Sequence, residues 1–220
     1  MAAAVATRRV SRLQRHFSAA GSPKVALITC ATRFMGPMST KALIADGFSV
    51  FCHDRSFGGD DPSAATARAN FEAEHPGAKA LSAQVPAEIV SELLRTSGGM
   101  APDVLINNDD HKGDGLPIEQ ADIADFRDTL EDLVVFPFHL VRSSGLTASN
   151  LHSPVTCFRR RIPAQTSLLV PALKKKGKGK IIFVTSATGV RQTASAMYST
   201  ARTATNGLTK VLPRPVVLSP

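Results

Sequence analysis

Short apolar runs alternate with helical patterns along this 220-residue chain, and that alternation limits the fold more than any other feature. The run at 24–29 is almost continuously apolar and the others are mostly so, which is typical of strands buried on both faces of a parallel sheet. The expected strands are 24–29, 48–54, 102–108 and 179–186. The expected helices are 36–47, 63–75, 86–99, 123–141 and one that begins near residue 196. This order predicts an α/β fold with a doubly wound parallel sheet.

The length and composition are those of a single globular domain, with 43% hydrophobic and 20% charged residues. No apolar run reaches the roughly 18 residues that a membrane-spanning helix needs, so no membrane partner is expected. The three cysteines, Cys30, Cys52 and Cys157, share no metal-ligand spacing. They are interpreted as buried or free thiols, and no metal site is expected.

The net charge of +8 is unevenly placed, because the chain has no Asp or Glu from Leu133 to its last residue. Basic residues in this half cluster at 159–161 and 174–180. A nucleic-acid partner is not expected, since the chain has one Tyr, no Trp and no nucleic-acid-binding motif. The basic clusters are interpreted as solvated loop.

The first 22 residues are excluded from the predicted domain, which spans 23–220. They are rich in arginine and alanine, contain serine, lack acids, and place Val10, Leu13 and Phe17 on one face of a possible helix. That composition is typical of a mitochondrial transit peptide. The segment RHFSAA is similar to a presequence cleavage site, with the cut after Phe17. The alternative is a disordered basic tail on a cytoplasmic protein.

The turn after the first strand, TCATRFMG, has nearly the pattern of a nucleotide-binding loop. Such a loop needs glycines, because bare backbone N–H groups and a helix N-terminus must approach the pyrophosphate. Cys30 and Phe34 stand where two of those glycines would be, and only Gly36 remains. The Phe34 ring would fill space that a dinucleotide needs.

A second chemical pattern lies near the end of the chain, where Ser186 ends a predicted strand and YSTAR begins twelve residues later. Tyrosine is a weak base near neutral pH, and a cation one helical turn away favours its phenolate form. Arg202 stands at that spacing from Tyr198. A serine hydroxyl at the same point could hydrogen-bond a substrate oxygen, so the three residues form a plausible proton-abstracting set.

These segments resemble the short-chain dehydrogenase/reductase superfamily over residues 24 to about 212, apart from 142–165. VALIT followed by Gly36 is similar to its glycine loop, DVLINN to its asparagine strand, and IIFVTSATG with YSTAR to its Ser–Tyr–basic site. The resemblance implies a Rossmann-like fold. In ordinary members the last site residue is lysine, and here it is Arg202, whose planar guanidinium is not equivalent.

In both departures, the changed glycine loop and the arginine in place of lysine, the chain resembles the halohydrin dehalogenases. These form a cofactor-free branch of the superfamily. They have Thr-x4-Phe/Tyr-x-Gly in place of the glycine loop and Ser–Tyr–Arg in place of Ser–Tyr–Lys. The matching residues are Thr29, Phe34 and Gly36 for the loop, and Ser186, Tyr198 and Arg202 for the catalytic set. The resemblance implies a lyase that converts vicinal haloalcohols to epoxides and halide, acts as a homo-oligomer and needs no nucleotide. It also implies that Phe34 helps to wall a halide pocket and that Asp109 pairs with the active-site arginine.

Two alternatives remain open. One is an NAD- or NADP-dependent oxidoreductase, in which Asp54 after the second strand would bind a ribose hydroxyl. Thr29, Gly36 and Asn107 would be its other cofactor-binding residues. The other is a truncated, inactive relative.

Some features depart from the dehalogenase pattern. The Ser-to-Tyr spacing is one residue shorter than in the family, unless Thr185 stands at the serine position. Residues 142–165 read as an irregular insertion into a helix, and 213–220 read as altered sequence in place of the last two strands.

Overall fold

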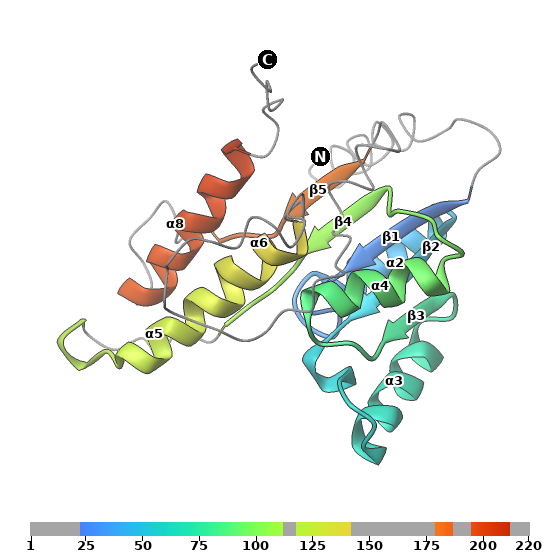
Figure 1. The fold of residues 1–220 in the computed structure, drawn as a ribbon, viewed down its shortest axis with the longest axis horizontal. Coiled ribbons are helices and arrows are strands. Elements are labelled where there is room, and N and C mark those ends of the chain that lie inside the picture. Colours follow the sequence, from blue (N-terminus) through green and yellow to red (C-terminus); the bar gives the residue numbers. More distant parts are fainter. Residues whose placement is uncertain (1–22, 112–117, 142–178, 187–194, 212–220) are drawn as a thin grey trace, which may run out of the picture.

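The computed structural model describes residues 23–111, 118–141, 179–186 and 195–211. Within these ranges five parallel strands form one sheet in the order β3-β2-β1-β4-β5 (Figure 1). The strands are β1 Lys24–Ile28, β2 Phe48–His53, β3 Ala78–Leu81, β4 Val104–Asn107 and β5 Lys180–Phe183. This confirms the predicted α/β class with a doubly wound, Rossmann-like parallel sheet.

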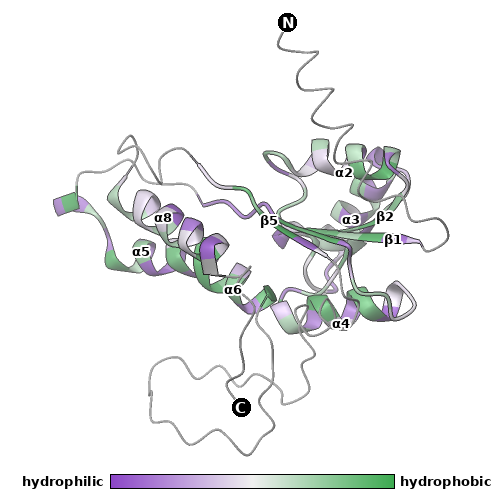
Figure 2. Ribbon diagram, turned by 90° about the horizontal axis from the view of Figure 1, so that it is seen from above, coloured by the Kyte–Doolittle hydropathy of each residue, from purple (hydrophilic) through white to green (hydrophobic). Residues whose placement is uncertain are grey.

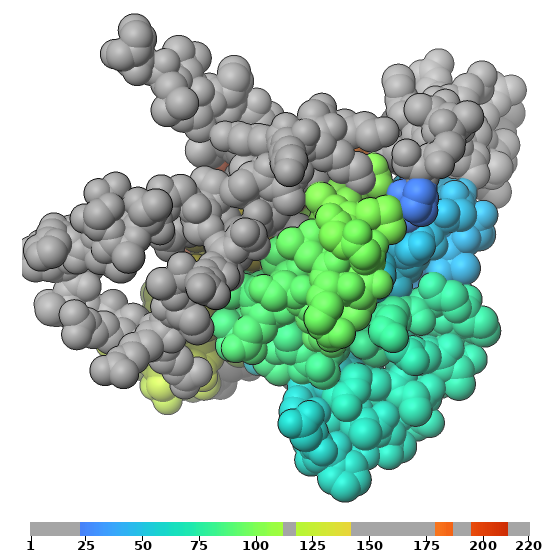
Figure 3. All heavy atoms as spheres, turned by 45° about the vertical axis from the view of Figure 1, so that its right-hand side comes forward, coloured from blue at the N-terminus to red at the C-terminus, as the bar shows by residue number. Residues whose placement is uncertain are grey.

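Helices cover both faces of the sheet, which explains why the strand segments are mostly apolar (Figure 2). Helices α2 (Gly36–Ala45) and α3 (Pro62–Glu74) pack on one face, where Ala26 and Ile28 of β1 point. Helices α4 (Pro86–Thr96) and α6 (Phe136–Val141) pack on the other face, against Val25 and Leu27. In the space-filling view α3 and α4 form one continuous surface (Figure 3).

The helix predicted at 123–141 is divided into three parts. These are α5 (Ile123–Leu130), a π-helical turn labelled η3 (Glu131–Val135), and α6. The last helix, α8 (Ala196–Val211), packs against α5 and η3. The hydroxyl of Thr205 donates to the Leu133 carbonyl of the π turn at 2.8 Å. Such turns occur often at functional sites.

The strand order reverses direction between β1 and β4, since β2 and β3 lie on one side of β1 and β4 and β5 on the other. In open α/β sheets the crevice outside the carboxyl ends of the strands at such a reversal is the usual ligand site. The segments that follow β1, β2 and β4 therefore surround the place where a ligand is expected.

The expectations for residues 1–22, 142–165 and 213–220 lie outside the described residues. Within the described ranges no helix is long and apolar enough to cross a membrane. The same ranges contain no group of three or more His, Cys, Asp or Glu side chains placed to hold a metal ion.

Candidate active site

The loop between β1 and α2 keeps the backbone of a glycine loop at two positions that carry side chains. Cys30 has a φ of 48° and Phe34 a φ of 49°, both in the left-handed region that favours glycine. Each costs roughly 1–2 kcal/mol relative to a relaxed backbone. Position 36 has no room for a side chain, because a Cβ on Gly36 would lie 2.4 Å from the Ala31 carbonyl oxygen. All three positions at which the sequence predicted the glycines of a nucleotide-binding loop therefore have a backbone conformation or packing that favours glycine.

Asp54, the expected ribose-binding acid of the oxidoreductase alternative, is bonded to this loop instead. Its Oδ2 accepts hydrogen bonds from the Thr32 N–H at 3.1 Å and the Thr32 hydroxyl at 2.7 Å. Its Oδ1 accepts from the Ser56 N–H at 3.0 Å and the Ser56 hydroxyl at 2.8 Å. Burial acts to raise the pKa of Asp54, but these bonds outweigh it and hold the pKa below its ordinary value. The Asp54 carboxylate thus ties the loop after β1 to the segment that follows β2.

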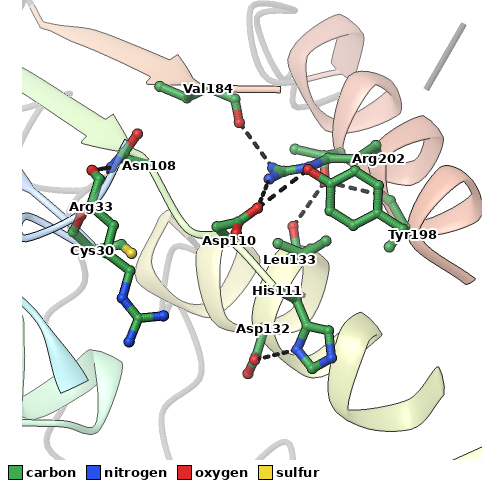
Figure 4. Close-up of polar contacts among 12 residues, drawn as sticks. Cys30, Arg33, Asn108, Asp110, His111, Asp132, Leu133, Val184, Tyr198 and Arg202 are labelled. Atoms are coloured by element: carbon green, nitrogen blue, oxygen red, sulfur yellow. Dashed lines mark hydrogen bonds and ion pairs between the residues drawn. The ribbon is translucent and has the colours of Figure 1, made fainter. Parts of the chain in front are cut away.

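Asn108, which the sequence patterns did not single out, holds the other side of the loop. Its side-chain nitrogen donates to the carbonyls of Cys30 and Arg33, each at 2.9 Å (Figure 4). Asn107, a cofactor-binding residue of the oxidoreductase alternative, is buried at the end of β4. Among the described residues neither polar atom of the Asn107 side chain has a hydrogen-bond partner.

Tyr198 and Arg202 meet on α8 as their i, i+4 spacing predicted. The guanidinium carbon lies 5.0 Å from the centre of the tyrosine ring. Asp110 joins them, because its Oδ1 accepts from the tyrosine hydroxyl at 3.3 Å and from Arg202 Nη2 at 3.0 Å (Figure 4). Arg202 Nη1 also donates to the carbonyl of Val184 at 3.0 Å. The arginine is buried, so its charge is held in a fixed direction.

The acid that pairs with Arg202 is Asp110, whereas the sequence had assigned that role to Asp109. Asp109 instead accepts from the Thr29 hydroxyl at 2.8 Å. The two neighbouring acids therefore have different partners, Asp110 on α8 and Asp109 on the loop after β1. Burial raises the pKa of Asp109 to about 7, against the opposing effect of the Thr29 hydrogen bond. Among the weaker charge effects, Arg55 lowers that pKa and Asp132 raises it.

Ser186 and Phe34 differ in burial, because Ser186 is partly buried and Phe34 is exposed. Ser186 is half-buried and follows the end of β5 by three residues. The bond from Arg202 to the Val184 carbonyl ties α8 to this same segment, two residues before Ser186. Phe34 is 65% exposed, so its ring belongs to neither hydrophobic core and remains available to a ligand.

Sequence patterns missed a group of three polar side chains beside the site, namely Arg55, His111 and Asp132. Asp132 of the π turn forms an ion pair with Arg55. Its Oδ2 also makes a hydrogen bond with His111 Nδ1 at 2.9 Å (Figure 4). Arg55 follows β2 and His111 follows β4, so the group links the segments after the two strands that flank β1. The three residues are far apart in the sequence, so no pattern showed that they meet. The one local sign of a functional residue was Asp132, an acid directly before the apolar run LVVF.

Three solved structures illustrate the similarity to known proteins. One described as a dehalogenation enzyme is 36% identical with a TM-score of 0.66, and the match covers 85% of this chain and 64% of that one. Halohydrin dehalogenase HheC bound to ethyl (2S)-oxiran-2-ylacetate is 25% identical with a TM-score of 0.67, covering 86% of this chain and 63% of that one. NAD+-bound xylitol dehydrogenase is 20% identical with a TM-score of 0.63, covering 86% and 63%, and supports the fold alone.

The chain therefore spans less than two thirds of the length of either dehalogenase. No curated protein sequence matches it. The family model described as short chain dehydrogenase matches residues 24–217, which includes the loop after β1, the asparagine strand and the Tyr–Arg helix. By this match the chain belongs to the short-chain dehydrogenase family.

Proposed function

We propose that this chain is a halohydrin dehalogenase-like lyase, which converts vicinal haloalcohols to epoxides and halide without a nucleotide cofactor. The observation that carries the proposal is the loop after β1, which holds Cys30 and Phe34 at backbone positions that favour glycine. The similarity to a dehalogenation enzyme and to HheC supports the same reaction class.

The residues around the loop do not fit a dinucleotide, although structural neighbours include NAD+ and NADPH complexes. Pyrophosphate binding requires backbone N–H groups that point outward. Here the N–H of Ala31 donates to the His53 carbonyl at 3.0 Å and that of Thr32 donates to Asp54. The oxidoreductase alternative needs Asp54 for a ribose hydroxyl, and four hydrogen bonds already use this carboxylate.

The chemistry requires one base, one oxygen-binding group and room for a halide. Tyr198, as phenolate, takes the proton from the substrate hydroxyl, which Ser186 holds by a hydrogen bond. The alkoxide then attacks the neighbouring carbon, the C–O bond of the epoxide forms, and the carbon–halogen bond breaks with both electrons leaving on the halide. No redox step occurs. In reverse, a small anion opens the epoxide and Tyr198 returns the proton.

Arg202 and Asp110 act on Tyr198 from two sides. The guanidinium lies against the ring and stabilises the phenolate that forms during proton transfer. Asp110 is a positioning residue, because its Oδ1 accepts from the hydroxyl of the neutral tyrosine and from the guanidinium. The carbonyl of Val184 completes the orientation of the arginine.

Halide release from a small vicinal bromoalcohol tests the proposal. Tyr198→Phe removes the base and should lower the rate by at least about a hundredfold, within the range that a general base contributes. Arg202→Lys keeps the charge but loses the planar fork, so the rate should fall and its pH profile should move. Arg127→Lys, the same change on the exposed surface of α5, is the control and should behave as wild type. Equal rates for wild type and Tyr198→Phe would contradict the proposal.

A further inference from the structure

Asp110 orders the catalytic pair, yet it lies in a segment that belongs to neither a helix nor a strand. Its Oδ1 is bonded to both Tyr198 and Arg202 on α8 (Figure 4). A side chain on irregular backbone keeps such a position only if neighbouring contacts hold the segment. The position of Tyr198 therefore depends on what fastens the residues before and after Asp110.

The residues before Asp110 are fastened to β1 and the loop that follows it. The Asn108 side chain donates to two carbonyls of that loop, and its backbone N–H donates to the Thr29 hydroxyl oxygen at 3.1 Å. On the other side of Asp110, His111 Nδ1 lies 2.9 Å from Oδ2 of Asp132. Within the described part of the chain, this bond fastens Asp110 from the downstream side.

The partner of His111 is itself held in place. Asp132 is buried in the π turn, and its Oδ1 is paired with the Arg55 guanidinium. A carboxylate paired with an arginine accepts hydrogen bonds and donates none, so Nδ1 of His111 carries the hydrogen of the bond. The Arg55 side chain is 71% exposed, so water screens its charge, whereas His111 and Asp132 meet where water has little access.

The π turn returns to the catalytic helix through its next residue. The hydroxyl of Thr205 on α8 donates to the Leu133 carbonyl at 2.8 Å, and both residues are buried. The contacts therefore form a closed ring, which passes from α8 through Asp110 and His111 to the π turn and back to α8. Buried polar networks of this kind make a site rigid.

We propose that His111 is a positioning residue for the Tyr198 base. Its imidazole fastens the segment that carries Asp110 to the π turn, and this holds the tyrosine hydroxyl beside the carboxylate and the guanidinium. The imidazole points toward Asp132 and not toward Tyr198, so it acts through Asp110 (Figure 4). The inference deepens the proposed function and rests on it for the role of Tyr198 as base.

The rate of halide release by matched variants tests this role. His111→Ala opens the ring and should lower kcat about ten- to a hundredfold with little change in KM, because a small misplacement of a catalytic group has an effect of this size. His111→Asn keeps an N–H donor for Asp132 and should restore most of the rate. Thr205→Val opens the ring at its other end and should resemble His111→Ala. His139→Ala, the same change at a partly exposed histidine of α6, is the control and should behave as wild type.

The ionisation of Tyr198 is a second readout and needs no substrate. The chain has one Tyr and no Trp, so the change in ultraviolet absorbance on phenolate formation reports Tyr198 alone. Asp110→Asn removes a negative charge that opposes the phenolate, so ionisation should occur at lower pH than in wild type. His111→Ala should shift the ionisation in the same direction, and His111→Asn should leave it as in wild type. Circular dichroism at each pH restricts the comparison to folded protein.

The two readouts separate the inference from the function on which it rests. If His111→Ala keeps the wild-type rate and the wild-type ionisation of Tyr198, the inference is wrong. A loss of rate without a shift in ionisation would overturn the route through Asp110, and equal losses in His111→Asn and His111→Ala would overturn the role of the donor to Asp132. Absence of halide release by wild type would overturn the proposed function, whereas a shifted ionisation in His111→Ala would still support the positioning of Tyr198.

Discussion

Two adjacent, nearly isosteric substitutions, Asp110→Asn and Asp109→Asn, should change the free energy of unfolding in opposite directions near pH 8. Asp110 neutralises a buried arginine, whereas Asp109 is a carboxylate whose ionisation opposes folding. The pair therefore tests whether the structure has assigned the two acids correctly. It requires no substrate, halide or cofactor.

Asp110→Asn leaves the Arg202 charge without its partner. The side chains of Asp110 and Arg202 are 13% and 6% exposed, so water screens the pair only weakly. Removing one partner of a buried ion pair typically costs about 3–5 kcal/mol. Arg202 keeps its bond to the Val184 carbonyl but has no second anion among its described partners. We expect a loss of this size near pH 8.

Asp109→Asn should stabilise the protein near pH 8. The folded-state pKa of about 7 lies above the ordinary 3.8, so the folded form holds a proton that the unfolded form has released. Stability is thus fully present below about pH 4 and declines as the pH rises to about 7. The difference in pKa corresponds to about 4 kcal/mol as an upper value. Asparagine never ionises, so the variant gains up to that amount near pH 8 and almost nothing near pH 4.

Urea unfolding followed by far-ultraviolet circular dichroism measures both effects, since the chain contains no Trp. The three proteins are compared near pH 8, and wild type and Asp109→Asn are compared again near pH 4.5. If both substitutions destabilise the protein near pH 8 by similar amounts, the assignment of Asp110 to Arg202 and of Asp109 to Thr29 is wrong.

Three further predictions concern the loop and the N-terminal segment. Gly36→Ala should cost about 1–3 kcal/mol in urea unfolding, because the new methyl group would overlap the Ala31 carbonyl oxygen, and wild-type stability would contradict the packing given for that turn. Cys30→Gly combined with Phe34→Gly should still fail to bind NADH or NADPH in calorimetry, because Asp54 and Asn108 keep the loop closed; micromolar binding would favour the oxidoreductase alternative. We also propose that the N-terminal segment directs import into mitochondria, so a fluorescent protein fused after residues 1–25 should be mitochondrial in eukaryotic cells, and diffuse cytosolic fluorescence would count against it.

The parts of the site that are close together in the sequence could be predicted from it. The loop follows a fully apolar strand, so Cys30, Phe34 and Gly36 could be placed from local pattern alone. Tyr198 and Arg202 share a helix face at i, i+4, and the structure confirms their contact. The strands that form β1, β2 and β4 were predicted because burial on both faces leaves mostly apolar segments, and β5, which is less buried, was predicted from its apolar residues Ile181, Ile182 and Phe183.

The parts that depend on tertiary direction could not be predicted. Strand β3 was missed because its four residues, AKAL, include a lysine and are too few to carry a pattern. The choice between Asp109 and Asp110 depends on which way the chain leaves β4, and no sequence rule fixes that direction. The link from Asp132 to Arg55 joins residues 77 apart in the sequence, so no local pattern predicts it.

The most direct measurement of the central claim is halide release by protein that has been freed of nucleotides, with a vicinal bromoalcohol as substrate and with NAD+ or NADP+ either added or omitted. The account predicts that bromide is released in both cases at the same rate, that Tyr198→Phe releases none above background, and that no reduced nicotinamide is formed. Reduction of added NAD+ or NADP+ by an alcohol, without release of halide from any of several haloalcohols, would contradict it.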